Sequence, residues 1–100
     1  MNQMLKQAQK MQADMTSLQE DLEQREYTAT SGGGMVEVTV DGKHLIKSIK
    51  ISPDAVDPDD AEMLEDLITV AVNEAISNAI KTSEEEMGAI TGGLNMPGLF

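Results

Sequence analysis

The chain has 100 residues, enough for one small domain, and its 18 acidic side chains against 7 Lys and Arg give a formal net charge of −11. Because it contains no cysteine, disulfide bonds and thiolate metal sites are excluded. Only 2% of the residues are aromatic and eight are methionine, so the core of a single chain would be thin, and we expect self-association to supplement it.

Residues 1–24 are predicted to form one helix, since good helix formers dominate and neither glycine nor proline interrupts them. Apolar side chains recur at alternating intervals of three and four residues, which is the pattern of a heptad seam. The seam consists of Met1, Met4, Ala8, Met11, Met15, Leu18 and Leu22. Such a narrow seam suits a partner helix. We therefore interpret the seam as a dimerisation or docking surface, and the alternative is that it packs on its own domain.

Three short strands are predicted next, at about 27–31, 35–40 and 44–51. The glycine run at 32–34 separates the first two strands and permits a tight connection with positive φ angles. In the second strand three valines alternate with polar residues, which predicts one buried face. Asp41-Gly42 is typical of a hairpin turn, so the strands should form an antiparallel meander that needs cover on one face.

The third strand departs from strict alternation. Ile46 and Ile49 would point to opposite faces of a regular strand, so we predict a β-bulge near Lys47 and Ser48. Lys47 could also pair across the sheet with Glu37, a contact of modest strength.

A second helix is predicted over about 58–87, with Asp57 as its N-cap, the following proline as its first residue and Gly88 ending it. Its apolar stripe is wide enough to cover the sheet and to contact another chain. The stripe residues that we predict at a dimer interface are Leu64, Leu67, Ile68, Ala71, Val72, Ala75 and Ile76. The expected fold is therefore α+β, with one domain over 1–87 and a flexible Gly- and Met-rich tail over 88–100.

Catalytic chemistry is poorly supported, because His44, the single histidine, has neither a cysteine nor a carboxylate constellation to orient it. The acidic residues between 54 and 62 complement a helix dipole better than they fit a calcium loop. We therefore expect no enzymatic activity, no metal or cofactor and no small-molecule substrate. No apolar stretch reaches 18 residues and no signal peptide is recognisable, so we expect a soluble cytoplasmic protein without membrane contact.

The positive charges are concentrated in one half of the chain. Residues 1–51 contain six bases against seven acids, whereas residues 52–100 contain one base against eleven acids. Salt screens charges over about 8 Å, so a local group of lysines could still meet phosphate. Lys6 and Lys10 lie four residues apart, away from the apolar seam, in a stretch of thirteen residues without an acid. A second candidate group along the hairpin consists of Lys43, Lys47 and Lys50.

The order and spacing of three segments carry a resemblance that covers essentially the whole chain. They are SGGGMVEVTVDGK at 31–43, EMLEDLITVAVNEA at 62–75 and MGAITGGLNMPGLF at 87–100. In this order they resemble the YbaB/EbfC family of bacterial nucleoid-associated proteins. The resemblance implies an α–β–β–β–α fold in a homodimer, with the first helices of the two chains projecting from a shared core.

The resemblance also implies a function, namely binding of duplex DNA in the nucleoid by phosphate contacts, with coating or bridging of the DNA. In this family, DNA contact is attributed to the projecting helix and to nearby basic residues. The resemblance assigns these roles here to Lys6, Lys10 and Arg25, with Lys43, Lys47 and Lys50 as a secondary group. Arg25 departs from this pattern because acidic residues surround it. The alternative is a protein-binding scaffold or adaptor that uses the Met-rich seam and the apolar tail and does not bind DNA.

Overall fold

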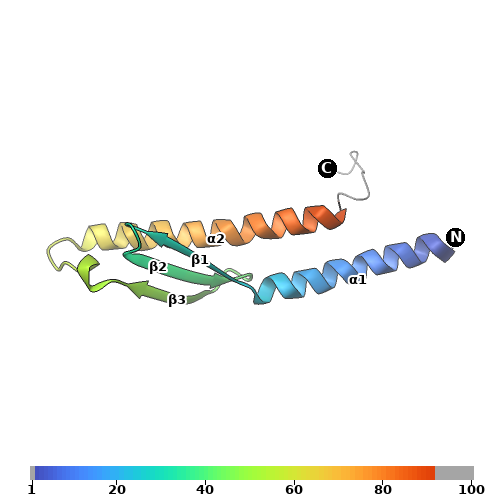
Figure 1. The fold of residues 1–100 in the computed structure, drawn as a ribbon, viewed down its shortest axis with the longest axis horizontal. Coiled ribbons are helices and arrows are strands. Elements are labelled where there is room, and N and C mark those ends of the chain that lie inside the picture. The colour runs from blue at the N-terminus through green and yellow to red at the C-terminus, as the bar shows by residue number, and fades with distance from the viewer. Residues whose placement is uncertain (1, 92–100) are drawn as a thin grey trace.

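The computed structural model describes residues 2–91 of the chain, and its architecture is α+β, as predicted (Figure 1). The elements in order are α1 (Asn2–Gln24), β1 (Glu26–Ser31), β2 (Val36–Asp41), β3 (Ile46–Ile51), the 3-10 helix η1 (Pro53–Ala55) and α2 (Ala61–Thr91). No helix within residues 2–91 is long and apolar enough to cross a membrane.

The three strands form one antiparallel sheet in the order β1-β2-β3. Thr39 of β2 lies opposite Ser48 of β3, but the next residue, Val40, lies opposite Ile46. Lys47 is therefore the extra residue of a β-bulge, which confirms the predicted irregularity. The bulge places Ile46 on the same face of the sheet as the buried valines of β2.

Helix α2 packs across β1 and β2 and covers one face of the sheet. Val36, Val38 and Val40 of β2 are completely buried on this face. The helix residues in the same cluster are small, namely Ala71, Ala75 and Ala79. Alanines at successive turns let the helix backbone approach the sheet closely, so the core is thin and formed by small side chains.

The SGGG turn between β1 and β2 is tied to α2. The Ser31 hydroxyl donates a hydrogen bond of 2.6 Å to the backbone carbonyl of Leu67. Gly32 has a φ of +62°, and a Cβ atom there would lie 2.9 Å from a methyl carbon of Leu67. Glycine is favoured at this position chiefly by the positive φ, because the Leu67 methyl group can move away from a Cβ atom.

Both ends of α2 differ from the prediction. The prediction that Asp57 is the N-cap of α2 is wrong. The Asp57 side chain accepts a hydrogen bond of 2.9 Å from the amide of Asp59, and its carbonyl accepts one of 3.0 Å from the amide of Asp60. These bonds form a separate turn, and the Asp60 carboxylate instead accepts from the amide of Met63 at the start of α2. Gly88 does not end the helix, which tolerates a glycine at a cost of about 1 kcal/mol. The rest of the predicted tail, 92–100, lies outside the described residues.

Candidate nucleic-acid interface

The C-terminal end of α1 is fixed to both the hairpin and α2. Leu22 is only 4% exposed. Gly42 of the hairpin lies so close to α1 that a Cβ atom there would stand 1.8 Å from the carbonyl oxygen of Leu22. Just after the helix, Arg25 forms ion pairs with Asp21 of α1, at 2.6 Å, and with Glu86 of α2. The direction of α1 is therefore set at its C-terminal end.

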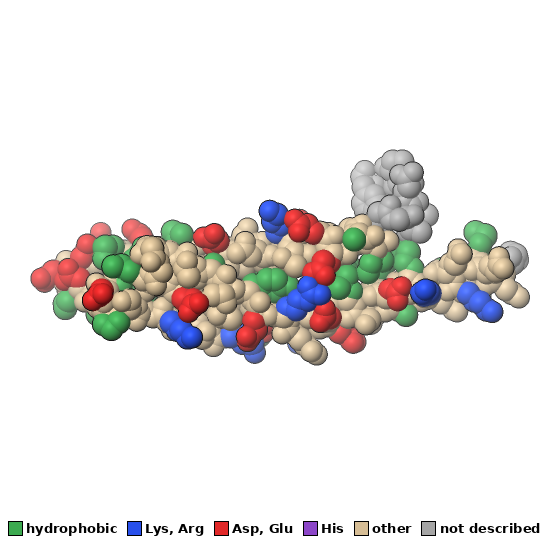
Figure 2. All heavy atoms as spheres, viewed as in Figure 1, with side chains coloured by type: hydrophobic (Ala, Val, Ile, Leu, Met, Phe, Trp, Pro, Cys, Tyr) green, Lys and Arg blue, Asp and Glu red, His purple; other side chains and the backbone are tan. Residues whose placement is uncertain are grey.

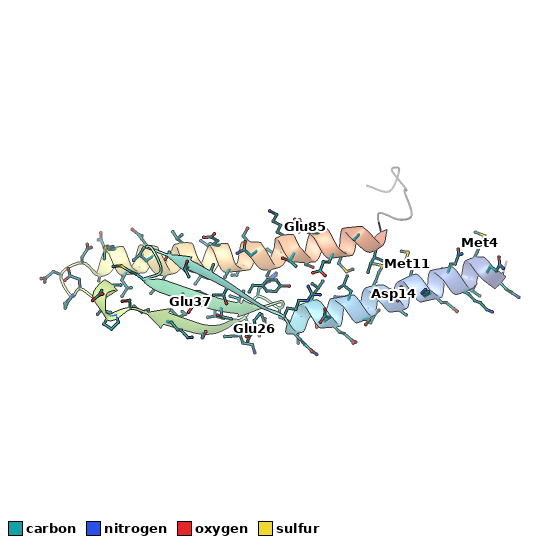
Figure 3. The ribbon with its side chains drawn as sticks, in the orientation of Figure 1. Met4, Met11, Asp14, Glu26, Glu37 and Glu85 are labelled. Atoms are coloured by element: carbon teal, nitrogen blue, oxygen red, sulfur yellow. The ribbon has the colours of Figure 1, made fainter. Side chains whose placement is uncertain are left out.

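The apolar seam of α1 is buried progressively along the helix. Leu18, Met15 and Met11 are half-buried, whereas Met4 is 76% exposed. Figure 3 shows Met11 across from the end of α2 and Met4 farther out, beyond that end. The interpretation of the whole seam as a dimerisation or docking surface needs correction, because its C-terminal part faces its own chain and only the N-terminal part is free.

The free end of α1 is basic. Lys6 and Lys10 are exposed and, among residues 2–91, take part in no ion pair, while the first acid of the helix is Asp14. In Figure 2 Lys side chains lie near the tip of this end, an acidic side chain lies next to the inner one, and acidic side chains gather at the opposite end of the same face. The first turn holds no acid that would neutralise the positive end of the helix dipole.

The hairpin lysines lie among acidic side chains. Lys47 Nζ is 3.7 Å from Asp41 Oδ2, and Lys50 Nζ is 4.0 Å from Glu37 Oε2. The suggested pair between Lys47 and Glu37 is wrong, because the bulge places Lys50 opposite Glu37. Lys43 shares a shallow surface hollow with Asp41 and two further acids of the α1–β1 junction. These lysines present less net positive charge than Lys6 and Lys10 do.

Asp41 has a structural role that the charge pattern did not reveal. Its side chain, in a residue only 6% exposed, accepts bonds of 3.0 Å from the Leu45 amide and 2.8 Å from the Lys43 amide. The Leu45 bond contributes most to lowering the pKa of Asp41, and the Lys43 bond and the charge of Lys47 add to it. The Asp-Gly hairpin signal implied a turn but could not show that the carboxylate closes it.

Arg25 is engaged in holding the fold together. Its pKa is raised because the Glu86 and Asp21 carboxylates accept hydrogen bonds from the guanidinium group. Two carboxylates on one guanidinium leave the local net charge negative, so Arg25 is the least available of the predicted DNA contacts. The contact with Glu86 joins residues 61 positions apart, a pairing that helical spacing cannot indicate.

The predicted dimer residues lie along the face of α2 that meets the sheet. Ala71 and Ala75 have no exposed surface in the single chain. The others are half-buried against the core, namely Leu64, Leu67, Ile68, Val72 and Ile76. Only the half-buried members retain surface that a second chain could contact.

Comparison with known proteins places these features in a family. The sequence profile of the YbaB/EbfC DNA-binding family matches residues 1–94. A nucleoid-associated protein of Alkaliphilus metalliredigens is 54% identical over 100 residues, covering 100% of this chain and 88% of the relative. A nucleoid-associated protein of Desulforamulus reducens is 55% identical over 100 residues, covering 100% of this chain and 95% of the relative.

The fold itself also occurs in a solved structure. The crystal structure of an uncharacterized protein from Helicobacter pylori matches with a TM-score of 0.63 at 22% identity, covering 78% of this chain and 90% of the other. At this identity the likeness concerns the fold alone. The sequence relationships and the matching profile show that the chain belongs to the YbaB/EbfC DNA-binding family.

Proposed function

We propose that the protein is a nucleoid-associated, non-enzymatic protein that binds duplex DNA as a homodimer, with the free ends of its α1 helices on the phosphates. The observation that carries this proposal is the exposed, acid-free end of α1 with Lys6 and Lys10, in a chain whose family is DNA-binding. Its relatives are named for their association with the nucleoid, and that location is part of the proposal.

The net charge of −11 does not prevent such binding. The described chain is 69 Å long, and the acidic segment at 54–66 lies at the end opposite the N-terminus of α1 (Figure 1). Charges farther apart than about 8 Å are largely screened at physiological salt. A phosphate at the first turns of α1 therefore experiences mainly Lys6, Lys10 and the helix dipole, and Asp14, one turn after Lys10, is the nearest acid of this helix.

The distribution of apolar side chains supports the homodimer. The fully buried side chains are small, whereas several large ones are exposed, among them Ile46, Ile49, Val56, Val70 and Ile80. The radius of gyration is 19.2 Å, compared with about 13 Å for a compact chain of this length. A chain that exposes its large apolar groups in this way gains stability when a second copy covers them.

We place the dimer surface on β3 and the adjacent flank of α2. Ile46, Ile49 and Ile51 face the same side of the sheet as the buried valines of β2, but they are 48%, 41% and 38% exposed because α2 packs over β1 and β2. On α2, Ile80 lines a hollow of about 370 Å³ together with Leu22 of α1 and His44 of the β2–β3 turn, so this flank of the helix faces the end of the hairpin that leads into β3. Val72 and Ile76 precede Ile80 by two turns and one turn.

An Ile49→Asp substitution is expected to convert the protein to monomers. A charge in the apolar interface lacks a partner, so we expect the dimer dissociation constant to rise at least about 100-fold, measured by sedimentation equilibrium. Ser48→Asp is the matched control, because it adds the same charge to the neighbouring residue on the opposite face. Unchanged association of Ile49→Asp would place the dimer interface elsewhere.

DNA binding is tested by the salt dependence of affinity for a labelled duplex of about 30 base pairs. If four lysines of a dimer contact phosphates, log K should fall with log salt with a slope of about −3.6, so affinity should drop about 150-fold between about 50 and 200 mM salt. Fluorescence anisotropy measures both values, and a scrambled duplex should compete equally because phosphate contacts carry no sequence information. Absence of binding at about 20 mM salt would reject the proposal in favour of a protein-binding adaptor.

A further inference from the structure

Part of the α1 seam is uncovered in the described chain. Met4 is 76% and Leu5 is 59% exposed, and Ala8 on the next turn is exposed as well. Met11, one further turn along the seam, is half-buried. These four residues are here called the distal seam. An apolar strip on a projecting helix favours a covering segment, because its exposure to water is unfavourable.

The end of α2 lies near the point where this exposure begins. Helix α2 runs antiparallel to α1 and ends at Thr91, and α1 continues beyond that end (Figure 1). Met4 and Met11 point to the same side of α1, the side on which α2 lies (Figure 3). A chain that continues past Thr91 in the direction of α2 would therefore run along the distal seam.

The sequence that follows Thr91 suits an apolar surface. Residues 92–100 read GGLNMPGLF, with no charged side chain in a protein in which 25% of residues are charged. Four of the nine side chains are large and apolar, namely Leu94, Met96, Leu99 and Phe100. Methionine on both sides of such a contact adapts its shape easily.

We infer that residues 92–100 pack along the distal seam of their own chain and complete the antiparallel pair that α1 and α2 begin. The required reach is short. Met4 and Met11 are seven residues apart, which is about 10 Å along a helix axis. Nine residues can extend up to about 30 Å, so the segment covers the strip even if Gly92 and Gly93 form a turn.

This contact uses the side of α1 opposite the basic face. Lys6 and Lys10 are about 200° and 240° around the helix from Met4, at 100° per residue. A covering segment therefore leaves both lysines open to solvent. The contact does not depend on DNA binding, so the two proposals can fail separately.

Disulfide formation between introduced cysteines tests the inference, because the natural chain has no cysteine. The test variant is Ala8→Cys with Leu94→Cys, made in the full chain and oxidised mildly at low protein concentration. The control variant is Ala13→Cys with Leu94→Cys, which makes the same alanine replacement at an exposed position on the opposite side of α1. We expect the Ala8 variant to form an intramolecular disulfide at least about ten times faster than the control, seen by non-reducing electrophoresis and peptide mass mapping.

The possible outcomes distinguish which segment covers the distal seam. Equal rates in the two variants would overturn the inference. A disulfide-linked dimer of the Ala8 variant would also overturn it, since it would assign the strip to the segment of another copy. A second measurement does not depend on cysteines: removal of residues 92–100 should increase the oxidation rate of Met4 by peroxide several-fold, and an unchanged rate would contradict the proposal.

Discussion

Replacement of Gly42 by alanine is expected to lower the melting temperature by about 10 °C or more. The new Cβ atom would stand 1.8 Å from the carbonyl oxygen of Leu22 and 2.6 Å from its carbonyl carbon. Both are backbone atoms, so no side-chain rotation relieves the clash and the end of α1 must leave the hairpin. Overpacking of this kind costs about 1–3 kcal/mol or more, and each kcal/mol shifts the melting temperature of a domain of this size by about 4–8 °C.

Calorimetry at a fixed protein concentration gives the melting temperature, and hydrogen exchange of residues 18–24 reports on the end of α1. Gly88→Ala is the matched control, because a Cβ atom at this helical position meets nothing within 4 Å. It should raise the melting temperature by a few degrees, since alanine favours a helix over glycine by about 1 kcal/mol. An unchanged melting temperature in Gly42→Ala would show that α1 does not rest on the hairpin.

The double substitution Lys6→Glu and Lys10→Glu is expected to abolish detectable binding of duplex DNA at low salt. In a dimer it changes four positive charges at the free ends of α1 into four negative ones, so the attraction for phosphate becomes repulsion. Both side chains are exposed and away from the seam, so melting temperature and dimerisation should stay unchanged. Anisotropy titration at about 50 mM salt, together with sedimentation, measures each effect.

The control for this variant is Lys47→Glu with Lys50→Glu. It makes the same change in charge on lysines that already lie near Asp41 and Glu37. We expect a loss of affinity of less than about tenfold, because these lysines contribute little net attraction. If the hairpin variant lost binding and the α1 variant kept it, DNA contact would belong to the sheet.

The elements of the fold could be predicted because each follows from local sequence. The heptad spacing predicted α1, the valine alternation predicted β2, and the interrupted spacing of Ile46 and Ile49 predicted the bulge at Lys47. The start of α2 was misplaced because four closely spaced residues, Asp57 to Asp60, offer two rival capping positions. Turn bonds around Asp57 decided between them.

The candidate site was only partly predictable, because contacts between elements far apart in the sequence decide whether a basic side chain is free to contact DNA or forms an ion pair within the fold. The basic face of Lys6 and Lys10 could be predicted from helical spacing alone. The engagement of Arg25 by Glu86, and of Lys50 by Glu37, depends on helix docking and strand register. The same applies to β3, whose isoleucines look like core residues in sequence and lie outside the cover of α2.

The bulge at Lys47 constrains the number of residues in β3 more strongly than the type of residue at position 47. The side chain of Lys47 is half exposed to solvent and its Nζ atom lies 3.7 Å from Asp41 Oδ2, so other residue types could replace it at small cost. Its presence as a link in the chain is different, because one residue fewer would turn Ile46 to the other face and break up the row that it forms with Ile49 and Ile51. Position 47 should therefore tolerate substitution in evolution and resist deletion.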